Sequence, residues 1–223
     1  MQISERLRAV AGMVSPGCRL ADVGTDHAYI PIYLMQNGVI PQAVAMDINQ
    51  GPLLRATENI RRYGLTGRIE TRLSDGLEKL QAGEADTILI AGMGGLLMVR
   101  ILENGQGVLA GCRELVLQPQ SDIRSVRAYL EEKGWQLDRE DLVFEDGKYY
   151  PMMRAVKTEQ DETWNRLNDQ TIAVCDIYGP LLLRNGNPVL RRFLVRQHGQ
   201  LTQILQTLEA QKESEQIIRR IAE

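Results

Sequence analysis

The chain has 223 residues, 43% of them hydrophobic, and a formal net charge of -3 at neutral pH. This length suffices for one α/β domain with a smaller attachment. The slightly negative net charge excludes a protein that attracts nucleic acid through its overall charge, so any nucleic-acid contact depends on local basic patches. No apolar run is long enough to span a membrane, and three widely spaced cysteines predict reduced thiols in a cytoplasmic protein without a metal site.

Helical and extended patterns alternate through the first 134 residues. A short helix is predicted after Ser4, ending before Pro16-Gly17. Strands are then predicted over 18–24, 43–49, 68–76, 86–95 and 114–120. Helices are predicted over 28–36, 51–64, 98–109 (with a broken end) and 121–134 (with a capped start), and a short helical piece ends at Gly83. This alternation predicts a parallel sheet covered by helices on both faces.

The pattern changes twice after residue 134. Residues 135–157 form two extended segments joined around Asp146-Gly147, which predicts an antiparallel hairpin. Beyond Lys157, apolar residues recur at alternating steps of three and four, which predicts a helical hairpin, an antiparallel coiled coil. We therefore expect two domains, 1–158 and 159–223. The stripe consists of Trp164, Leu167, Thr171, Val174, Tyr178, Leu190, Leu194, Leu201, Ile204, Leu208 and Ile218.

The turn after the first predicted strand carries the most distinctive residues. Ligands of open α/β sheets bind at the carboxyl ends of the strands, and Gly24 lets the backbone approach a ligand there. Thr25 and the following amides offer donors, and a helix beginning near His27 favours an anion at its N-terminus. A strand-turn-helix without any ligand is the alternative.

The second predicted strand ends in Asp47, about 20 residues after the glycine turn, where an acid can accept both hydroxyls of a ribose. An NAD-dependent dehydrogenase would place an acid at the same point. The first turn distinguishes a dehydrogenase from a methyltransferase. A dinucleotide site needs G-x-G-x-x-G, whereas here Asp26 and Tyr29 occupy the later glycine positions. A carboxylate there would repel a pyrophosphate but suits the sulfonium and amino groups of S-adenosylmethionine.

The next three strands also end in polar or glycine-rich turns. Asp75 can accept a hydrogen bond from an adenine amine, although Ser74–Gly76 is also ordinary turn chemistry. The three glycines of Ala91–Gly95 let a planar group approach the backbone closely. Gln118–Gln120 could read a base edge or position a phosphate, or form an ordinary loop.

Several of these stretches together carry a resemblance to a family. DVGTDHAYIPIYL, MDIN, SDGL, IAGMGG and LVLQPQ, in this order, make the chain resemble the bacterial tRNA adenine-N1 methyltransferases that act on adenine 22 in the D-loop. The resemblance covers nearly the whole chain. It implies a Rossmann-like class I methyltransferase sheet with a terminal antiparallel hairpin, a C-terminal helical hairpin, S-adenosyl-L-methionine as cofactor and tRNA as substrate. Gln120 departs from a more usual asparagine after the proline.

The family reaction suits these residues. Adenine N1 has a free lone pair, so no proton must leave before it attacks, and the enzyme mainly holds the reacting atoms about 3–3.5 Å apart. Because the product base is a cation, a carboxylate would stabilise the developing charge. Asp26 is the candidate, and binding the cofactor's amino group is its competing role. Enzymes that methylate exocyclic amines carry an Asn/Asp-Pro-Pro-aromatic motif where this chain has Gly92–Gly95.

The expected site is as follows. Predicted catalytic residues are Asp26 and Tyr29. Predicted cofactor-binding residues are Asp22, Gly24, Thr25, Asp26, His27, Asp47, Ile48, Asn49, Ser74, Asp75, Gly76, Ala91, Gly92 and Met93. Predicted substrate-binding residues are Gly94, Gly95, Gln118, Pro119, Arg191 and Arg192. The last two belong to a basic group with Arg184 and Arg196, which we favour for phosphate contact over Arg61, Arg62, Arg68 and Arg72 or over Arg6 and Arg8.

Other interpretations remain open at this point. The chain could methylate another RNA, a protein or a small molecule, or it could be a cofactor-binding scaffold protein whose coiled coil recruits a partner without turnover. A dehydrogenase is the weakest alternative. A heptad stripe can close on itself or on a partner, so we expect a monomer or a weak homodimer.

Overall fold

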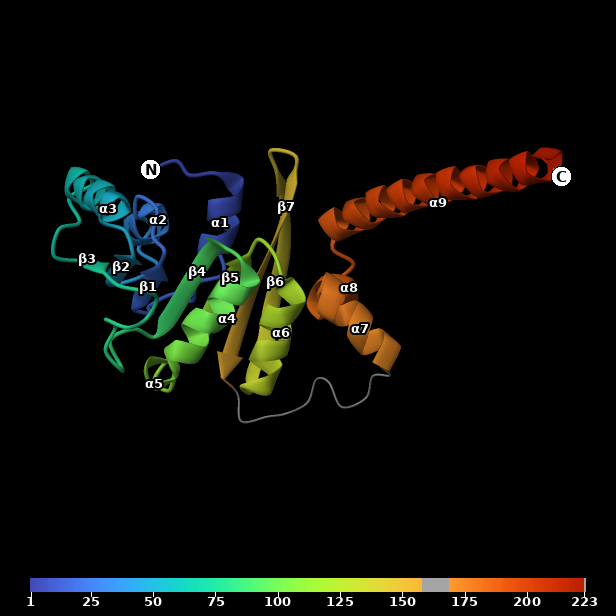
Figure 1. Cartoon of the computed structure of the whole chain (residues 1–223). Helices are drawn as coiled ribbons and strands as arrows, with labels where there is room; N and C mark the ends of the chain where they lie inside the picture. The colour runs from blue at the N-terminus through green and yellow to red at the C-terminus, as the bar shows by residue number, and fades with distance from the viewer. Residues whose placement is uncertain (158–168, 223) are drawn as a thin grey trace.

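A computed structural model describes residues 1–157 and 169–222 (Figure 1). Seven strands form one sheet in the order β3-β2-β1-β4-β5-β7-β6. The first five run parallel, and β7 lies antiparallel between β5 and β6, which confirms the predicted sheet with its terminal hairpin. The strands are β1 (Leu20–Val23), β2 (Ala43–Asp47), β3 (Ile69–Leu73), β4 (Thr87–Met93), β5 (Glu114–Pro119), β6 (Trp135–Glu145) and β7 (Lys148–Lys157).

Helices cover both faces of this sheet, as the alternation predicts. On β4, Ile88 and Ile90 pack toward α4, α5 and α6, whereas Leu89 packs toward α1, α2 and α3, and all three side chains are fully buried. Burial on both faces explains why the central strands read as continuous apolar runs. These helices are α1 (Glu5–Ala11), α2 (Tyr29–Gln36), α3 (Gln50–Arg62), α4 (Gly95–Asn104), α5 (Gln106–Leu109) and α6 (Ile123–Glu132).

Local details differ from the predictions at two places. The piece that ends at Gly83 forms turns rather than a helix. The cap predicted for α6 is wrong, because Asp122 adopts a left-handed φ of 50° and makes no side-chain bond to the helix. Its Oδ2 accepts a hydrogen bond from Ser121 Oγ instead, at 2.8 Å.

The β6–β7 hairpin turns where the sequence predicts it. Asp146 and Gly147 have φ values of 49° and 79°, and a two-residue turn with two positive φ values matches the right-handed twist of a hairpin. Glu145 pairs with Lys148 across the turn. The hairpin tip therefore stands at the carboxyl edge of the neighbouring parallel strands, which is where ligands of such sheets bind.

The C-terminal part is helical, with α7 (Asp169–Tyr178), α8 (Pro180–Arg184) and α9 (Pro188–Ala222). Leu190 at the start of α9 packs with Leu182 and with Leu142 of β6. Beyond these first turns α9 leaves the body of the molecule (Figure 1), and its 35 residues correspond to about 50 Å of helix.

The coiled-coil pairing stays a prediction. Trp164, Leu167 and the expected domain boundary lie outside the described residues. Along α9, Leu201, Ile204 and Leu208 are more than half exposed, so within 1–157 and 169–222 no second helix covers this part of the stripe. In the same described residues, no helix is both long and apolar enough to cross a lipid bilayer.

A buried ion pair attaches the C-terminal helices to the sheet domain. Arg127 of α6 lies 2.8 Å from the Glu140 carboxylate of β6, and both side chains are almost completely buried. Arg127 also donates to the carbonyl oxygen of Asp176 near the end of α7, at 2.6 Å. The second oxygen of Glu140 accepts from the Leu181 amide of α8, at 2.9 Å. Two charged side chains thus connect four elements.

Candidate active site

A cavity of about 780 Å³ lies at the carboxyl ends of β1 to β4. Both predicted catalytic residues and all predicted cofactor-binding residues except Thr25 and His27 line it. The lining residues are Ser4, Arg6, Leu7, Asp22, Val23, Gly24, Asp26, Tyr29, Ile30, Asp47, Ile48, Asn49, Ser74, Asp75, Gly76, Ala91, Gly92, Met93, Leu97, Arg100, Ile101, Gln120, Glu145, Asp146 and Tyr150. Residues at the ends of several strands therefore come together in one site.

Asp22 is the most deeply placed acid of this cavity. It lies on β1 between other buried residues, and Thr25 Oγ1 donates a 2.5 Å hydrogen bond to its Oδ2. Burial raises the pKa of Asp22 to about 7; the Thr25 hydrogen bond lowers it, and the Asp47 carboxylate raises it further. Thr25 thus acts through Asp22 and does not line the cavity itself.

The turn after β1 adopts an unusual backbone. Gly24 has a φ of 73°, and His27 and Ala28, which follow in the same turn, also lie in the left-handed region at 62° and 56°. Such conformations are costly for residues other than glycine and concentrate at functional sites. Because of them, α2 begins only at Tyr29, two residues later than His27, and no side chain caps it.

Contacts around His27 fix the direction of Asp26. The imidazole Nε2 lies 3.2 Å from Asp26 Oδ1, and the ring stacks on Tyr29 with centroids 5.1 Å apart. The His27 carbonyl oxygen accepts from Asn59 Nδ2 of α3, at 3.0 Å. The Asp26 side chain is 75% exposed, so a carboxylate stands on an anchored turn and faces the open cavity.

Acids also follow the second and third strands. Asp47 Oδ1 accepts a hydrogen bond from the Asn49 amide at 2.7 Å, which leaves its second oxygen for a ligand. Ser74 is buried, and its Oγ donates to the Gly76 carbonyl and accepts from the Lys79 amide. Ser74 therefore shapes the turn, as the ordinary turn interpretation holds, while the neighbouring Asp75 is exposed in the cavity.

The glycine cluster after β4 divides into two parts. Gly92 has a φ of 82° and lines the cavity. Gly95 is buried outside it, where a Cβ would lie 2.5 Å from the Ser121 carbonyl oxygen, so close packing of α4 on the β5–α6 loop explains this glycine. Gly94 is the residue before α4 and also lies outside the cavity lining.

The remaining predicted substrate residues do not line the cavity. Gln118 is fully buried, and Pro119 is buried beside it at the end of β5. Arg191 and Arg192 are exposed on α9, where the guanidinium carbon of Arg192 lies 4.6 Å from the centre of the Phe144 ring. Gln118 thus has a structural role, and neither arginine lines the cavity.

Arg6 and Tyr150, which are absent from the expected site residues, close the cavity. Arg6 of α1 donates to Gln118 Oε1 at 2.8 Å, and its guanidinium carbon lies 5.3 Å from the centre of the Tyr150 ring on β7. Its backbone amide donates to Glu145 Oε1 at 3.2 Å. No local pattern marks these contacts, because their partners are more than 100 residues apart in the sequence.

The charges of the cavity indicate the ligand that it suits. Asp22, Asp26, Asp47 and Asp75 come from three strand ends, whereas the lining cations are Arg6 and Arg100. Carboxylates accept hydrogen bonds from hydroxyls and amines and stabilise a cation, but they repel a pyrophosphate. Among the described residues no three His, Cys, Asp or Glu side chains are grouped to hold a metal ion.

Known proteins similar to this chain agree with one another. The model of a methyltransferase domain family matches residues 3–153. The chain is 36% identical over 189 residues to the tRNA (adenine(22)-N(1))-methyltransferase of Bacillus subtilis. This alignment covers 85% of this chain and 78% of that protein.

Solved structures extend this similarity to three dimensions. The B. subtilis m1A22 tRNA methyltransferase TrmK superposes with a TM-score of 0.80 at 36% identity, covering 89% of this chain and 85% of that one. TrmK of M. capricolum, solved with the natural cofactor product S-adenosyl-homocysteine, superposes with a TM-score of 0.78 at 31% identity, covering 92% and 88%.

Proposed function

The chain belongs to the family of tRNA (adenine-22-N1)-methyltransferases, and we infer that it is an enzyme that transfers a methyl group from S-adenosyl-L-methionine to N1 of adenine 22 in tRNA. One observation on this chain carries the inference beyond similarity. Four aspartates from the strand ends (Asp22, Asp26, Asp47 and Asp75) and three glycines with positive φ (Gly24, Gly76 and Gly92) line a single cavity at the carboxyl edge of a parallel sheet, where such folds bind nucleotide cofactors.

The residues present fit this cofactor. Asp47 would accept the ribose hydroxyls, and Asp75 would accept the exocyclic amine of the adenine. Asp22 and Asp26 would face the amino and sulfonium groups, while Gly24 and Gly92 let that ligand lie against bare backbone. When bound, S-adenosylmethionine supplies a methyl group that its sulfonium already activates.

The chain's own task is then to position the target base and to stabilise charge. Asp26 stands exposed on the anchored turn, and Tyr29 lies beside it with its ring parallel to His27. We propose that Asp26 stabilises the positive charge that develops on the adenine, and that Tyr29 contacts the base. Because N1 lies on the pairing edge, the base must be unpaired or extruded to reach this cavity.

Mass spectrometry of modified tRNA tests the function directly. Unmodified tRNA is incubated with the chain and a methyl-labelled cofactor, and the modified nucleoside is located by digestion. We expect label on N1 of adenine 22 alone, and none on a tRNA with another base at that position. Label at another nucleoside would reject the assigned target, and cofactor binding without label on any RNA would favour a scaffold protein.

The Asp22 carboxyl predicts a pH dependence of stability. In the unfolded chain its pKa lies near the ordinary value of about 4, whereas in the folded chain it is about 7. The folded state therefore binds an extra proton between these values, so this contribution is fully present below about pH 4 and is lost as the pH rises through about 7. Urea unfolding from pH 5 to pH 8 should show stability falling more in the parent chain than in Asp22→Asn.

Thr25→Val provides a second test of the same group. Without the Thr25 hydroxyl the pKa of Asp22 should rise further, so the fall in stability should extend to higher pH. Equal pH profiles for the parent, Asp22→Asn and Thr25→Val would contradict the assignment of this titration to Asp22.

Arg191 and Arg192 give a prediction about tRNA affinity. Both are exposed near the start of α9, and we propose that they contact phosphates of the tRNA. Replacing both with glutamate should weaken tRNA binding in a filter or fluorescence assay and leave the affinity for S-adenosylmethionine intact. Unchanged tRNA affinity would reject the contact.

Further features of the chain are proposals that support this function. We propose a division into a methyltransferase domain over 1–158 and a helical domain over 159–223. With tRNA as substrate and no helix in the described residues able to cross a bilayer, we propose a cytoplasmic location, and a monomer or weak homodimer as the working form.

A further inference from the structure

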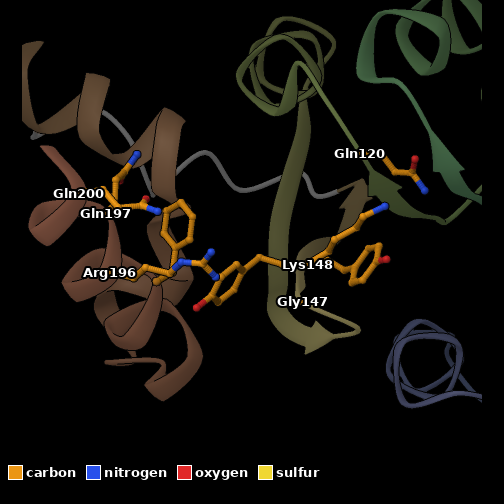
Figure 2. Close-up of a pocket in the computed structure, with 9 residues that line it drawn as sticks. Gln120, Gly147, Lys148, Arg196, Gln197 and Gln200 are labelled. Carbon is orange, nitrogen blue, oxygen red and sulfur yellow. The ribbon is translucent and has the colours of Figure 1, made fainter. Parts of the chain in front are cut away.

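A second cavity lies beside the active site, between the tip of the β6–β7 hairpin and the first turns of α9 (Figure 2). We name it the hairpin groove, and its volume is about 560 Å³. Three separate parts of the chain form it, so it exists only when α9 is docked. Its lining residues are Gln120, Gly147, Lys148, Tyr149, Tyr150, Phe193, Arg196, Gln197 and Gln200.

The hairpin groove continues the active site cavity. Gln120 and Tyr150 line both, and Figure 2 shows the Lys148 side chain extending from the hairpin toward Gln120. A strand that presents one base to Asp26 would therefore run past Tyr150 and Gln120 and enter the groove.

The side chains of the groove suit an anion that also accepts hydrogen bonds. Lys148 and Arg196 supply two cations, and within the described residues neither forms an ion pair with a carboxylate. Gln197 and Gln200 add amide groups. The nearby acids Glu145 and Asp146 line the active site cavity and not the groove.

The register of α9 decides which of its residues face the groove. Phe193, Arg196, Gln197 and Gln200 follow the spacing i, i+3, i+4 and i+7, which places them on one helix face. Phe193 meets the hairpin directly, because its ring lies 4.9 Å from that of Tyr149 in an edge contact. Figure 2 shows Arg196 extending from α9 toward the hairpin.

We propose that the hairpin groove binds the phosphodiester backbone of the tRNA strand directly beside the target adenosine, through Lys148 and Arg196. This rests on the proposed function and adds a substrate subsite to it. The groove holds the flanking backbone while the base enters the active site, so it contributes to binding and placement of the RNA and not to the methyl transfer itself.

Charge-neutral variants test the proposal. Lys148→Gln and Arg196→Gln should each weaken tRNA binding about tenfold, as expected for a lost hydrogen bond between charged groups. Each should also reduce the slope of log affinity against log salt by about 0.7–0.9, the value for one phosphate contact. The affinity for S-adenosylmethionine and the rate at saturating tRNA should stay near those of the parent. Arg61→Gln is the matched control, since it also removes one charge, from an exposed position on α3.

A modified substrate places the contact on the RNA. tRNAs carrying a neutral methylphosphonate linkage on either side of adenosine 22 should bind the parent more weakly. In Lys148→Gln or Arg196→Gln, one of the two neutral linkages should cost less tRNA affinity than it does in the parent, because the variant has already lost its contact with that phosphate. Such non-additivity identifies which side chain contacts which phosphate.

The outcomes separate this proposal from the function on which it rests. If the parent does not methylate adenine 22, the proposed function fails. If the parent methylates adenine 22 but the groove variants bind tRNA like the α3 control, the groove does not hold the flanking backbone. The same conclusion follows if the affinity lost by the groove variants adds fully to the affinity lost with the modified linkages. Unchanged tRNA binding by Lys148→Gln and Arg196→Gln would favour an acidic protein as the ligand of the groove, which also overturns the proposal.

Discussion

Asp26→Asn is expected to lower the rate of methyl transfer at saturating tRNA and cofactor by about 10²–10³-fold, the usual effect of removing one group that stabilises transition-state charge. The substitution keeps the size of the side chain and its contact with His27 Nε2, but it removes the negative charge. Adenine becomes a cation as N1 takes the methyl group, so an amide would stabilise the transition state far less than a carboxylate does. Single-turnover kinetics with labelled cofactor would measure this step.

Cofactor binding separates the two roles that Asp26 could have. If Asp26 mainly binds the amino group of the cofactor, Asp26→Asn should weaken S-adenosylmethionine and S-adenosyl-homocysteine equally and leave the rate at saturation unchanged. If it stabilises the adenine cation, the loss should fall on the rate. Asp26→Glu, which keeps the charge, should retain more activity, and Glu58→Gln, an exposed change on α3, should have no effect.

Glu140→Ala is expected to lower the free energy of unfolding by about 3–5 kcal/mol, because it leaves the Arg127 guanidinium buried without its partner. The Glu140 side chain is fully buried, and its two oxygens hold Arg127 and the Leu181 amide. Urea and thermal unfolding should both show the loss. In a chain of this size the melting temperature should fall by about 10 °C.

Two further variants identify the source of that loss. Asp138→Ala breaks the Arg154–Asp138 pair on the same hairpin, at 2.6 Å but with both side chains partly exposed, and should cost no more than about 1 kcal/mol. Arg127→Met/Glu140→Leu removes both charges and should recover much of the stability. Equal losses for Glu140→Ala and Asp138→Ala would show that burial of the pair is not what matters.

The Arg127–Glu140 pair also connects stability with substrate binding. It fastens α7 and α8 to the sheet domain, and α9 follows directly from α8. Loosening this attachment should displace Arg196 from the hairpin groove. Glu140→Ala should therefore raise the KM for tRNA more than that for S-adenosylmethionine, when both are measured well below the melting temperature of the variant.

Local patterns in the sequence are enough to predict the strands, their parallel arrangement and the acidic cavity. The order of the elements along the chain is enough to place Asp22, Asp47 and Asp75 together, because parallel strands bring their carboxyl ends to one edge of a sheet. Short-range rules also located the hairpin turn at Asp146-Gly147, since the residues of the turn determine its conformation.

Contacts between distant parts of the chain determine which other residues join that cavity and which do not. Arg6 and Tyr150 close it from the first helix and the last strand, whereas Gln118, expected to read substrate, is buried as a partner of Arg6. The apolar stripe of α9 predicted a helix but not its neighbour, and the groove beside Arg196 arises only where that helix meets the hairpin. The physical reason is that periodicity reports which side of an element is apolar, while the contacts of that side depend on residues far away in the sequence.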